Sequence, residues 1–185
     1  MKLVVGLGNP GRKYEGTRHN VGYAVLAELA RRFAAGRPKA KFQGEFVEAD
    51  ICGQKTILLS PLTYMNRSGA CVQAARDFYK LPNEDLLVVC DDFNLALAKL
   101  RFRSKGSAGG QKGLADVIRQ LGTEELPRLR IGIGSPPEGW DPTSYVLGKF
   151  GNEEREQIEL AVVQAADAVA VWVREGMEHC MNQYN

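Results

Sequence analysis

One histidine and one aspartate of this chain have the sequence context of a general base. His19 lies in the polar stretch Thr-Arg-His-Asn of residues 17–20, whereas a core histidine would more often lie on an apolar face. Asp91 ends the apolar run of residues 86–90, so a buried strand would deliver its carboxylate to the edge of a sheet. A carboxylate that orients an imidazole makes a general base. Asp92, which follows, is interpreted as a turn residue.

No covalent nucleophile accompanies this pair. The chain has no Gly-x-Ser-x-Gly elbow, and none of its four cysteines has a local motif for activation. Amide side chains are available at Asn9, Asn20 and Asn66. A base, an orienting acid and amides suit direct attack by an activated water on a reactive bond such as an ester.

The first glycine loop matches a dinucleotide-binding motif in spacing but not in context. Gly6, Gly8 and Gly11 follow an apolar run, as in that motif. A helix must begin inside the motif, whereas apolar periodicity begins here only at Val21. We interpret the loop as presenting Asn9 at the carboxyl end of a strand, and a plain strand-to-loop turn is the alternative.

The elements that must position these residues alternate between strands and helices. Strands are predicted at residues 2–8, 42–52, 55–60, 86–91, 99–105 and 129–134, and helices at residues 20–33, 69–79, 111–121 and 153–175. A tight turn at residues 53–54 would join the second and third strands. The order predicts a single α/β domain over residues 1–185, a sandwich whose twisted mixed sheet is flanked by helices on both faces.

Charge is segregated along the chain despite a net charge of only +2. Residues 1–41 hold nine basic residues (Lys or Arg) and two acidic ones. Residues 99–130 hold eight basic and three acidic residues, whereas residues 151–185 hold two basic and seven acidic residues. Strict alternation at residues 99–105 would place Lys99, Arg101, Arg103 and Lys105 on one face of a strand. The two basic segments could form one surface for a polyanionic partner, and solvated charge is the alternative.

Composition excludes several classes of protein. The chain of 185 residues is 44% hydrophobic and 25% charged, as globular proteins are. No apolar run approaches the ~20 residues of a membrane helix, and no secretory segment opens the chain. Four widely spaced cysteines predict free, mostly buried thiols in a reducing cytosol, and two histidines make a structural zinc site unexpected.

Several blocks of the sequence resemble bacterial peptidyl-tRNA hydrolases, in order and at the spacing of that family. They are residues 5–11 (VGLGNPG), Tyr14, residues 17–22 (TRHNVG), residues 63–69 (TYMNRSG), the pair 91–92 (DD), residues 105–110 (KGSAGG) and residues 129–134 (LRIGIG). The resemblance implies hydrolysis of the ester between peptide and tRNA, which releases both. It also implies a cytoplasmic monomer that needs no metal, cofactor or obligate protein partner.

The resemblance also assigns roles to matching positions. His19 would be the catalytic base, Asp91 the acid that orients it, and Asn9 the amide that senses a peptide-like ester. Further contacts with peptidyl-tRNA would come from Tyr14, Tyr64, Met65 and Asn66, and contacts with tRNA phosphate from Arg101, Arg103 and Arg130. Each role has an alternative. Asn66 could cap the following helix, Tyr14 and Tyr64 could be ordinary surface residues, and the arginines could be solvated.

The chain departs from the family pattern directly after the second glycine loop. Gln111 and Lys112 stand where the family commonly has His and Asn. Lys112 cannot accept a hydrogen bond, and its charge would disfavour protonation of a nearby His19. It could polarise the ester carbonyl, contact the terminal phosphate, impair activity or point to solvent. The departure keeps open a non-catalytic RNA-binding relative of the same fold, whereas a general esterase would leave the basic segments unexplained.

Overall fold

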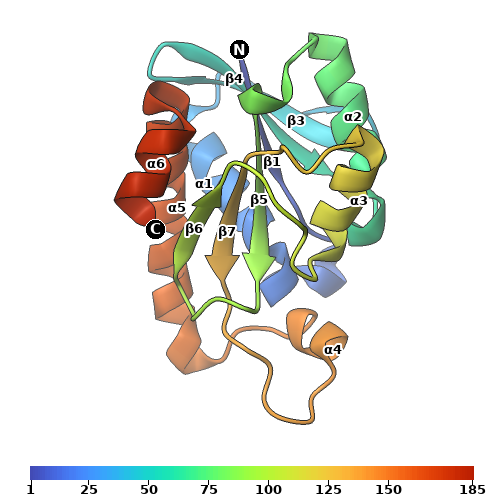
Figure 1. Ribbon diagram of the computed structural model, residues 1–185, viewed down its shortest axis with the longest axis vertical. Coiled ribbons are helices and arrows are strands. Elements are labelled where there is room, and N and C mark those ends of the chain that lie inside the picture. Colours follow the sequence, from blue (N-terminus) through green and yellow to red (C-terminus); the bar gives the residue numbers. More distant parts are fainter.

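The computed structural model describes residues 1–185 and contains one seven-stranded mixed sheet (Figure 1). In sheet order the strands are β2 (Lys39–Lys41), β3 (Gly44–Ile51), β4 (Gln54–Pro61), β1 (Lys2–Gly6), β5 (Leu86–Asp92), β7 (Arg128–Gly132) and β6 (Leu100–Arg103). The four central strands β4, β1, β5 and β7 are parallel, and the outer strands are antiparallel to their neighbours. Every residue of β5 is buried, as expected for a strand covered on both faces.

Helices cover both faces of this sheet (Figure 1). They are α1 (Val21–Phe33), α2 (Ser68–Tyr79), α3 (Lys112–Leu121), α4 (Pro142–Val146), α5 (Asn152–Glu175) and α6 (Met177–Tyr184). Apolar side chains of α1, α5 and α6 form one core against the sheet, and those of α2 and α3 form a second core on the other face. These two layers confirm the predicted α/β sandwich.

The parallel strands deliver their carboxyl ends to one edge of the sheet. The loops that leave this edge lead to three short 3-10 helices, η1 (Arg12–Tyr14), η2 (Arg18–Asn20) and η3 (Met65–Arg67), and to α4. A fourth, η4 (Asn83–Asp85), precedes β5. Ligand sites of α/β folds lie at such an edge, outside the carboxyl ends of the strands.

A close approach of α1 to the sheet brings η2 to this edge. A Cβ on Gly22 would lie 2.5 Å from the carbonyl oxygen of Val89 and 2.6 Å from that of Leu7, so only glycine fits. The first turn of α1 therefore rests on the ends of β1 and β5. His19, three residues earlier in η2, lies directly beside the carboxyl end of β5.

The structure corrects several predicted boundaries. The first strand ends at Gly6, and the first helix begins at Val21 because residues 18–20 form a 3-10 helix. The β3–β4 turn is formed by Cys52 and Gly53, both with positive φ, instead of residues 53–54. The predicted basic strand extends only over Leu100–Arg103, so Lys99 and Lys105 lie outside it.

Three short elements were not predicted. Strand β2 is fully exposed and carries no apolar pattern. Helix α6 has helical apolar spacing at Met177, Cys180, Met181 and Tyr184, but it has only eight residues, too few for a clear periodic signal. Helix α4 has only five residues, although Asp141 caps it and Pro142 begins it. A membrane-spanning helix is absent, since every helix is too short or too polar to cross a bilayer.

Candidate active site

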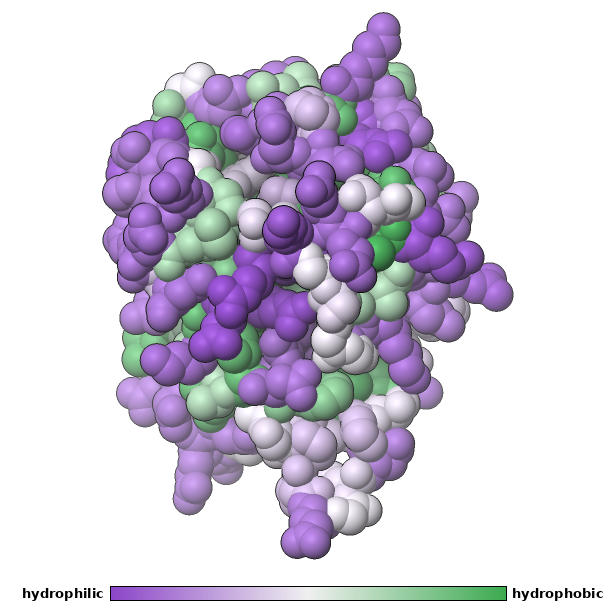
Figure 2. All heavy atoms as spheres, in the orientation of Figure 1, coloured by the Kyte–Doolittle hydropathy of each residue, from purple (hydrophilic) through white to green (hydrophobic).

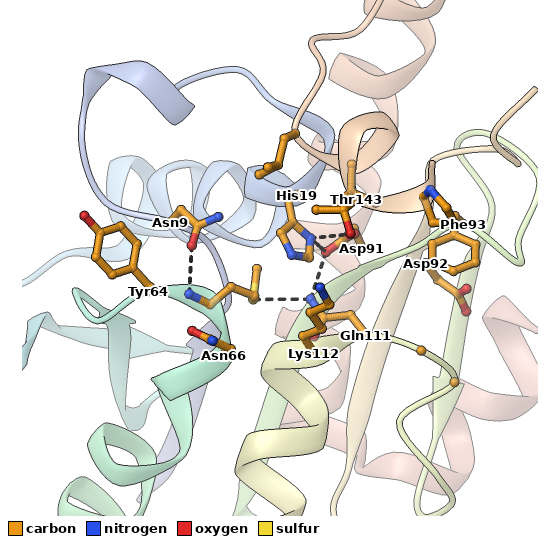
Figure 3. A pocket seen from close by; sticks show the side chains of 16 residues that line it. Asn9, His19, Tyr64, Asn66, Asp91, Asp92, Phe93, Gln111, Lys112 and Thr143 are labelled. Carbon is orange, nitrogen blue, oxygen red and sulfur yellow. Dashed lines mark hydrogen bonds and ion pairs between the residues drawn. The ribbon is translucent and has the colours of Figure 1, made fainter. Parts of the chain in front are cut away.

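A cleft of about 250 Å³ opens at the carboxyl edge of the sheet (Figure 3). Seven of the eleven predicted site residues line it, namely Asn9, His19, Tyr64, Met65, Asn66, Asp91 and Lys112. Residues of α4 complete one wall. Six separate stretches of sequence therefore converge on one cavity, and they bring together the base, the acid and two of the amides named in the sequence analysis.

His19 and Asp91 form a buried hydrogen-bonded pair. The Nδ1 atom of His19 lies 2.9 Å from both carboxylate oxygens of Asp91. Only 7% of His19 and 2% of Asp91 is exposed. Because an ionised carboxylate only accepts hydrogen bonds, Nδ1 must carry the proton, which leaves Nε2 as a proton acceptor. This is the arrangement of a general base held by a carboxylate.

Asn9 is fixed so that its amide offers hydrogen-bond donors to the cleft. Its backbone N–H donates to Oδ1 of Asn20 at 2.8 Å, and Nδ2 of Asn20 donates to its carbonyl at 2.9 Å. The Oδ1 atom of Asn9 accepts from the backbone N–H of Met65 at 2.7 Å. The Nδ2 group is then left to face the cleft (Figure 3). An N–H donor at this place suits recognition of a carbonyl oxygen.

The segment after β4 supplies three further cleft residues through η3. Met65 is buried and forms an apolar wall, whereas Tyr64 and Asn66 are exposed at the cleft. Asn66 does not cap the following helix, because α2 begins at Ser68 and its N-cap residue is Arg67. The alternative interpretation of Asn66 as a helix cap is therefore wrong.

Gln111 belongs to the cleft although the sequence analysis did not select it. Its Nε2 donates to Oδ1 of Asp91 at 3.0 Å, and its Oε1 accepts the backbone N–H of Leu114 at 2.7 Å (Figure 3). Nε2 also lies 3.4 Å from Sδ of Met65. Gln111 is therefore both the N-cap of α3 and a partner of the acid. Two signals in the sequence pointed to it: its place directly after a glycine loop, at the start of a predicted helix, and its departure from the histidine that the family commonly has there.

Lys112 begins α3 and lines the cleft with an exposed side chain. Asp141, which precedes α4, interacts electrostatically with Lys112. Hydrogen bonds from the backbone and hydroxyl of Ser144 lower the pKa of Asp141, and the charge of Lys112 contributes a smaller lowering. The ammonium group is therefore within electrostatic reach of the α4 wall.

Four arginines share one face of the β6–β7 edge, outside the cleft. Arg101 pairs across the strands with Arg130, and Arg103 pairs with Arg128. Hydrophilic side chains gather over these strands in Figure 2. Arg101 and Arg103 take part in no ion pair of this structure, and Arg103 is exposed. The shared face predicted for Arg101 and Arg103 is thus present.

The two arginines of β7 are engaged within the protein. Arg130 lies 3.3 Å from Asp92 and donates to the carbonyl of Ser107 at 2.7 Å. Arg128 is fully buried, and its guanidinium donates to the carbonyls of Gly106, Ser107, Glu124 and Leu126. Burial lowers the pKa of Arg128. Both side chains hold the glycine loop of residues 105–110 against the sheet.

Asp92 is the last residue of β5, so its interpretation as a turn residue is wrong, and its carboxylate pairs with Arg130. Its Oδ1 accepts the backbone N–H of Asn94 at 2.8 Å.

Tyr14 lies outside the cleft lining, half-buried in η1, with the ammonium group of Lys13 5.4 Å from its ring centre. Tyr14 is therefore not grouped with the predicted residues that line the cleft.

The cysteines are poor candidates for a nucleophile. Cys71, Cys90 and Cys180 are buried, Cys52 is exposed, and all four are free. Burial raises the pKa of Cys71 to about 12 and that of Cys180 to about 11. Burial also raises the pKa of Cys90, which directly precedes Asp91. Thiols held protonated are inert, which agrees with attack by water.

Comparisons with known proteins agree over nearly the whole chain. Residues 3–185 match the family model described as Peptidyl-tRNA hydrolase. A protein of that name from Rhodopirellula baltica is 55% identical over 185 residues, which covers 100% of this chain and 97% of the relative. Another from Geobacillus kaustophilus is 48% identical over 185 residues and is covered completely, as is this chain.

A solved structure extends the agreement to three dimensions. The crystal structure of peptidyl-tRNA hydrolase from Acinetobacter baumannii matches with a TM-score of 0.93 at 35% sequence identity. The match covers 100% of this chain and 94% of that one. It therefore includes the sheet, both helical layers and the segments that form the cleft.

Proposed function

The chain belongs to the peptidyl-tRNA hydrolase family, and we propose that its cleft hydrolyses the ester bond between a peptide and the terminal ribose of tRNA. The observation that carries this proposal is the buried His19–Asp91 pair, at 2.9 Å, in a cleft lined by amides. The products are a free peptide and a free tRNA. Such an activity rescues tRNA from peptides lost by the ribosome.

The chemistry follows from the proton on Nδ1 of His19. Nε2 removes a proton from water, and the water oxygen attacks the ester carbonyl. Asp91 stabilises the imidazolium that forms, and the imidazolium then returns its proton to the departing ribose oxygen. The amides of Asn9 and Asn66 donate to the carbonyl oxygens of the substrate as negative charge develops there.

A general base contributes about 10²–10⁴-fold to a rate, so the base cannot act alone. Orientation of the ester by Asn9, Met65 and Asn66, and electrostatic stabilisation of the oxyanion, must supply the rest. The reaction as written needs no metal or cofactor, because the His19–Asp91 pair activates the water.

We place the enzyme in the cytoplasm as a monomer that acts on peptidyl-tRNA without an obligate protein partner. A non-catalytic RNA-binding role is less well supported, because RNA binding alone gives no reason for the buried His19–Asp91 pair.

Release of labelled peptide from purified peptidyl-tRNA tests the proposal. We expect turnover by the purified protein, and little or none with aminoacyl-tRNA, whose amine is free. Tight tRNA binding without any release would contradict the proposal and favour the RNA-binding alternative.

Replacing Arg103 by alanine is expected to raise KM about fivefold and to change kcat little. Arg103 is exposed on the basic face, and one such charge contact with phosphate contributes about 1 kcal/mol. Phosphate contacts bind substrate and transition state alike, so their loss appears in KM. The slope of log tRNA affinity against log salt concentration should also become shallower, by about the amount that one phosphate contact contributes.

A short ester that carries only the terminal nucleotide separates this role from others. It cannot reach the basic face, so Arg103→Ala should leave its hydrolysis unchanged. Arg174→Ala, which removes an exposed cation of α5, is the matched control. Equal losses on the short and full-length substrates would show that Arg103 does not bind phosphate.

Lys112 is proposed to work in the cleft in place of the family's asparagine. Lys112→Ala should then lower peptide release about tenfold, and Lys112→Asn should restore much of it. Removing the cation favours the protonated imidazole, so the acid limb of the pH–rate profile should move to higher pH. An unchanged rate and an unmoved limb in Lys112→Ala would show that the side chain only points to solvent. A nearly inactive wild type that gains activity as Lys112→Asn would instead favour the RNA-binding alternative.

A further inference from the structure

We propose that Gln111 is a positioning residue for the general base, and that its side chain joins the acid, the apolar wall and helix α3 into one network. The inference rests on the proposed function, because positioning has meaning only for a catalytic His19–Asp91 pair. Gln111 is 7% exposed, and both ends of its amide are engaged.

The network around Gln111 closes into a ring through the cleft, and Figure 3 shows its bonds to Asp91 and Met65 and the bond between Met65 and Asn9. Gln111 contacts Asp91 at 3.0 Å and Met65 at 3.4 Å. The backbone of Met65 bonds Asn9, Asn9 is held by Asn20, and Asn20 follows His19 in η2. His19 returns to Asp91 at 2.9 Å. The base and the amide of Asn9 are thus fixed by the same ring.

The amide chemistry of glutamine matches this place. Nε2 must donate, because the oxygens of Asp91 accept, and Oε1 must accept, because the N–H of Leu114 donates. An ionised carboxylate could accept the hydrogen bond from Leu114 but could not donate one to Asp91. An apolar side chain could make neither hydrogen bond. Leu114 and Asp91 therefore set the orientation of the amide. The amide in turn holds Oδ1 of Asp91 in place, while both carboxylate oxygens of Asp91 face the imidazole of His19.

Gln111→Glu separates the two roles of the side chain. Where it is ionised, the new carboxylate would still accept from Leu114 and cap α3, but it could not donate to Asp91, which it would repel. We expect kcat on peptidyl-tRNA to fall at least tenfold while KM stays within about twofold, because no substrate contact is removed. The charged groups that line the cleft with His19 are Asp91, Asp92 with its partner Arg130, and Lys112, whereas the neighbouring Arg18 pairs with Glu154. An added negative charge among them favours imidazolium, so the acid limb should move to higher pH.

Gln111→Met removes both hydrogen bonds at similar volume and adds no charge. It should lower kcat without the upward move of the acid limb. Gln120→Glu makes the same charge change near the other end of α3 and is the matched control, with the kinetics of the wild type expected. Wild-type kcat and acid limb in Gln111→Glu would overturn the proposal, because they would show that Gln111 only caps the helix. Wild-type kcat in Gln111→Met would overturn it equally.

A measurement without substrate keeps this inference separate from the proposed function. The Nδ1 proton of His19, bonded to a buried carboxylate, should give a downfield proton resonance. We expect it to be sharp in the wild type and broadened or lost in folded Gln111→Met, whose far-UV circular dichroism should be unchanged. An unaltered resonance in Gln111→Met would overturn the positioning role. Absence of peptide release by the wild type would instead contradict the proposed function.

Discussion

Replacing His19 by alanine should lower peptide release from peptidyl-tRNA by about 10²–10⁴-fold, the range that a general base supplies. The imidazole is the one group of the cleft with a free acceptor nitrogen next to a carboxylate, at 2.9 Å. The fold should persist, because the side chain lies at the edge of the sheet and outside both apolar cores. Affinity for tRNA should also persist, because the basic face lies on other strands.

Two measurements check this expectation. Single-turnover release at neutral pH reports the chemical step, and a filter-binding assay with uncharged tRNA reports affinity. Retention of more than a tenth of the wild-type rate by His19→Ala would refute the general-base assignment, since that loss lies far below the expected range. Loss of tRNA affinity in the same variant would place His19 in binding instead of chemistry.

The meeting of His19 and Asp91 could be predicted because it depends on simple rules. An apolar run that ends in Asp91 predicts a buried strand, and the carboxyl ends of parallel strands share one edge. A polar segment at the start of a helix places His19 off the apolar face of that helix. The distance between them could not be predicted, because it depends on Gly22, which lets α1 rest on the strand ends.

The partners of Gln111 and Arg130 could not be predicted from local pattern. Gln111 bonds Asp91 across 20 positions of sequence, and Arg130 bonds Asp92 across 38. Arg130 lies opposite Arg101 in the sheet, and the sequence cannot show that a carboxylate of β5 already balances the charge of Arg130. Such contacts are set by how α3 and β7 pack beside β5, and sequence periodicity carries no signal of that distance.

Short elements were missed for a related reason. Strand β2 exists only because Lys39–Lys41 pairs with β3, and no residue of it is buried. Helix α6 is held by Cys180 and by the packing of Tyr184 against Phe102. Tertiary contact, and not intrinsic preference, stabilises both elements.

Replacing Asp91 by asparagine is expected to be more harmful than replacing it by alanine, with a loss on the order of 10⁴-fold. Nε2 of Gln111 donates to Oδ1 of Asp91, so the oxygen of the new carboxamide must stay beside Gln111. Its NH2 group then lies beside Nδ1 of His19, 2.9 Å away in the wild type, and donates to it. The imidazole must carry its proton on Nε2, toward the cleft, where it can no longer accept one from water. In Asp91→Ala, His19 keeps the choice of tautomer, so that loss should be milder.

A double variant tests the same logic in reverse. In Asp91→Asn combined with Gln111→Glu, the carboxylate at position 111 accepts from the asparagine NH2, so the asparagine oxygen turns toward Nδ1 of His19. The proton then returns to Nδ1, and Nε2 is again an acceptor, with one negative charge beside the pair as in the wild type. We expect the double variant to release peptide faster than Asp91→Asn alone, although each substitution alone is harmful. Losses that simply multiply would show that Gln111 does not orient the residue at position 91, because independent sites add in free energy.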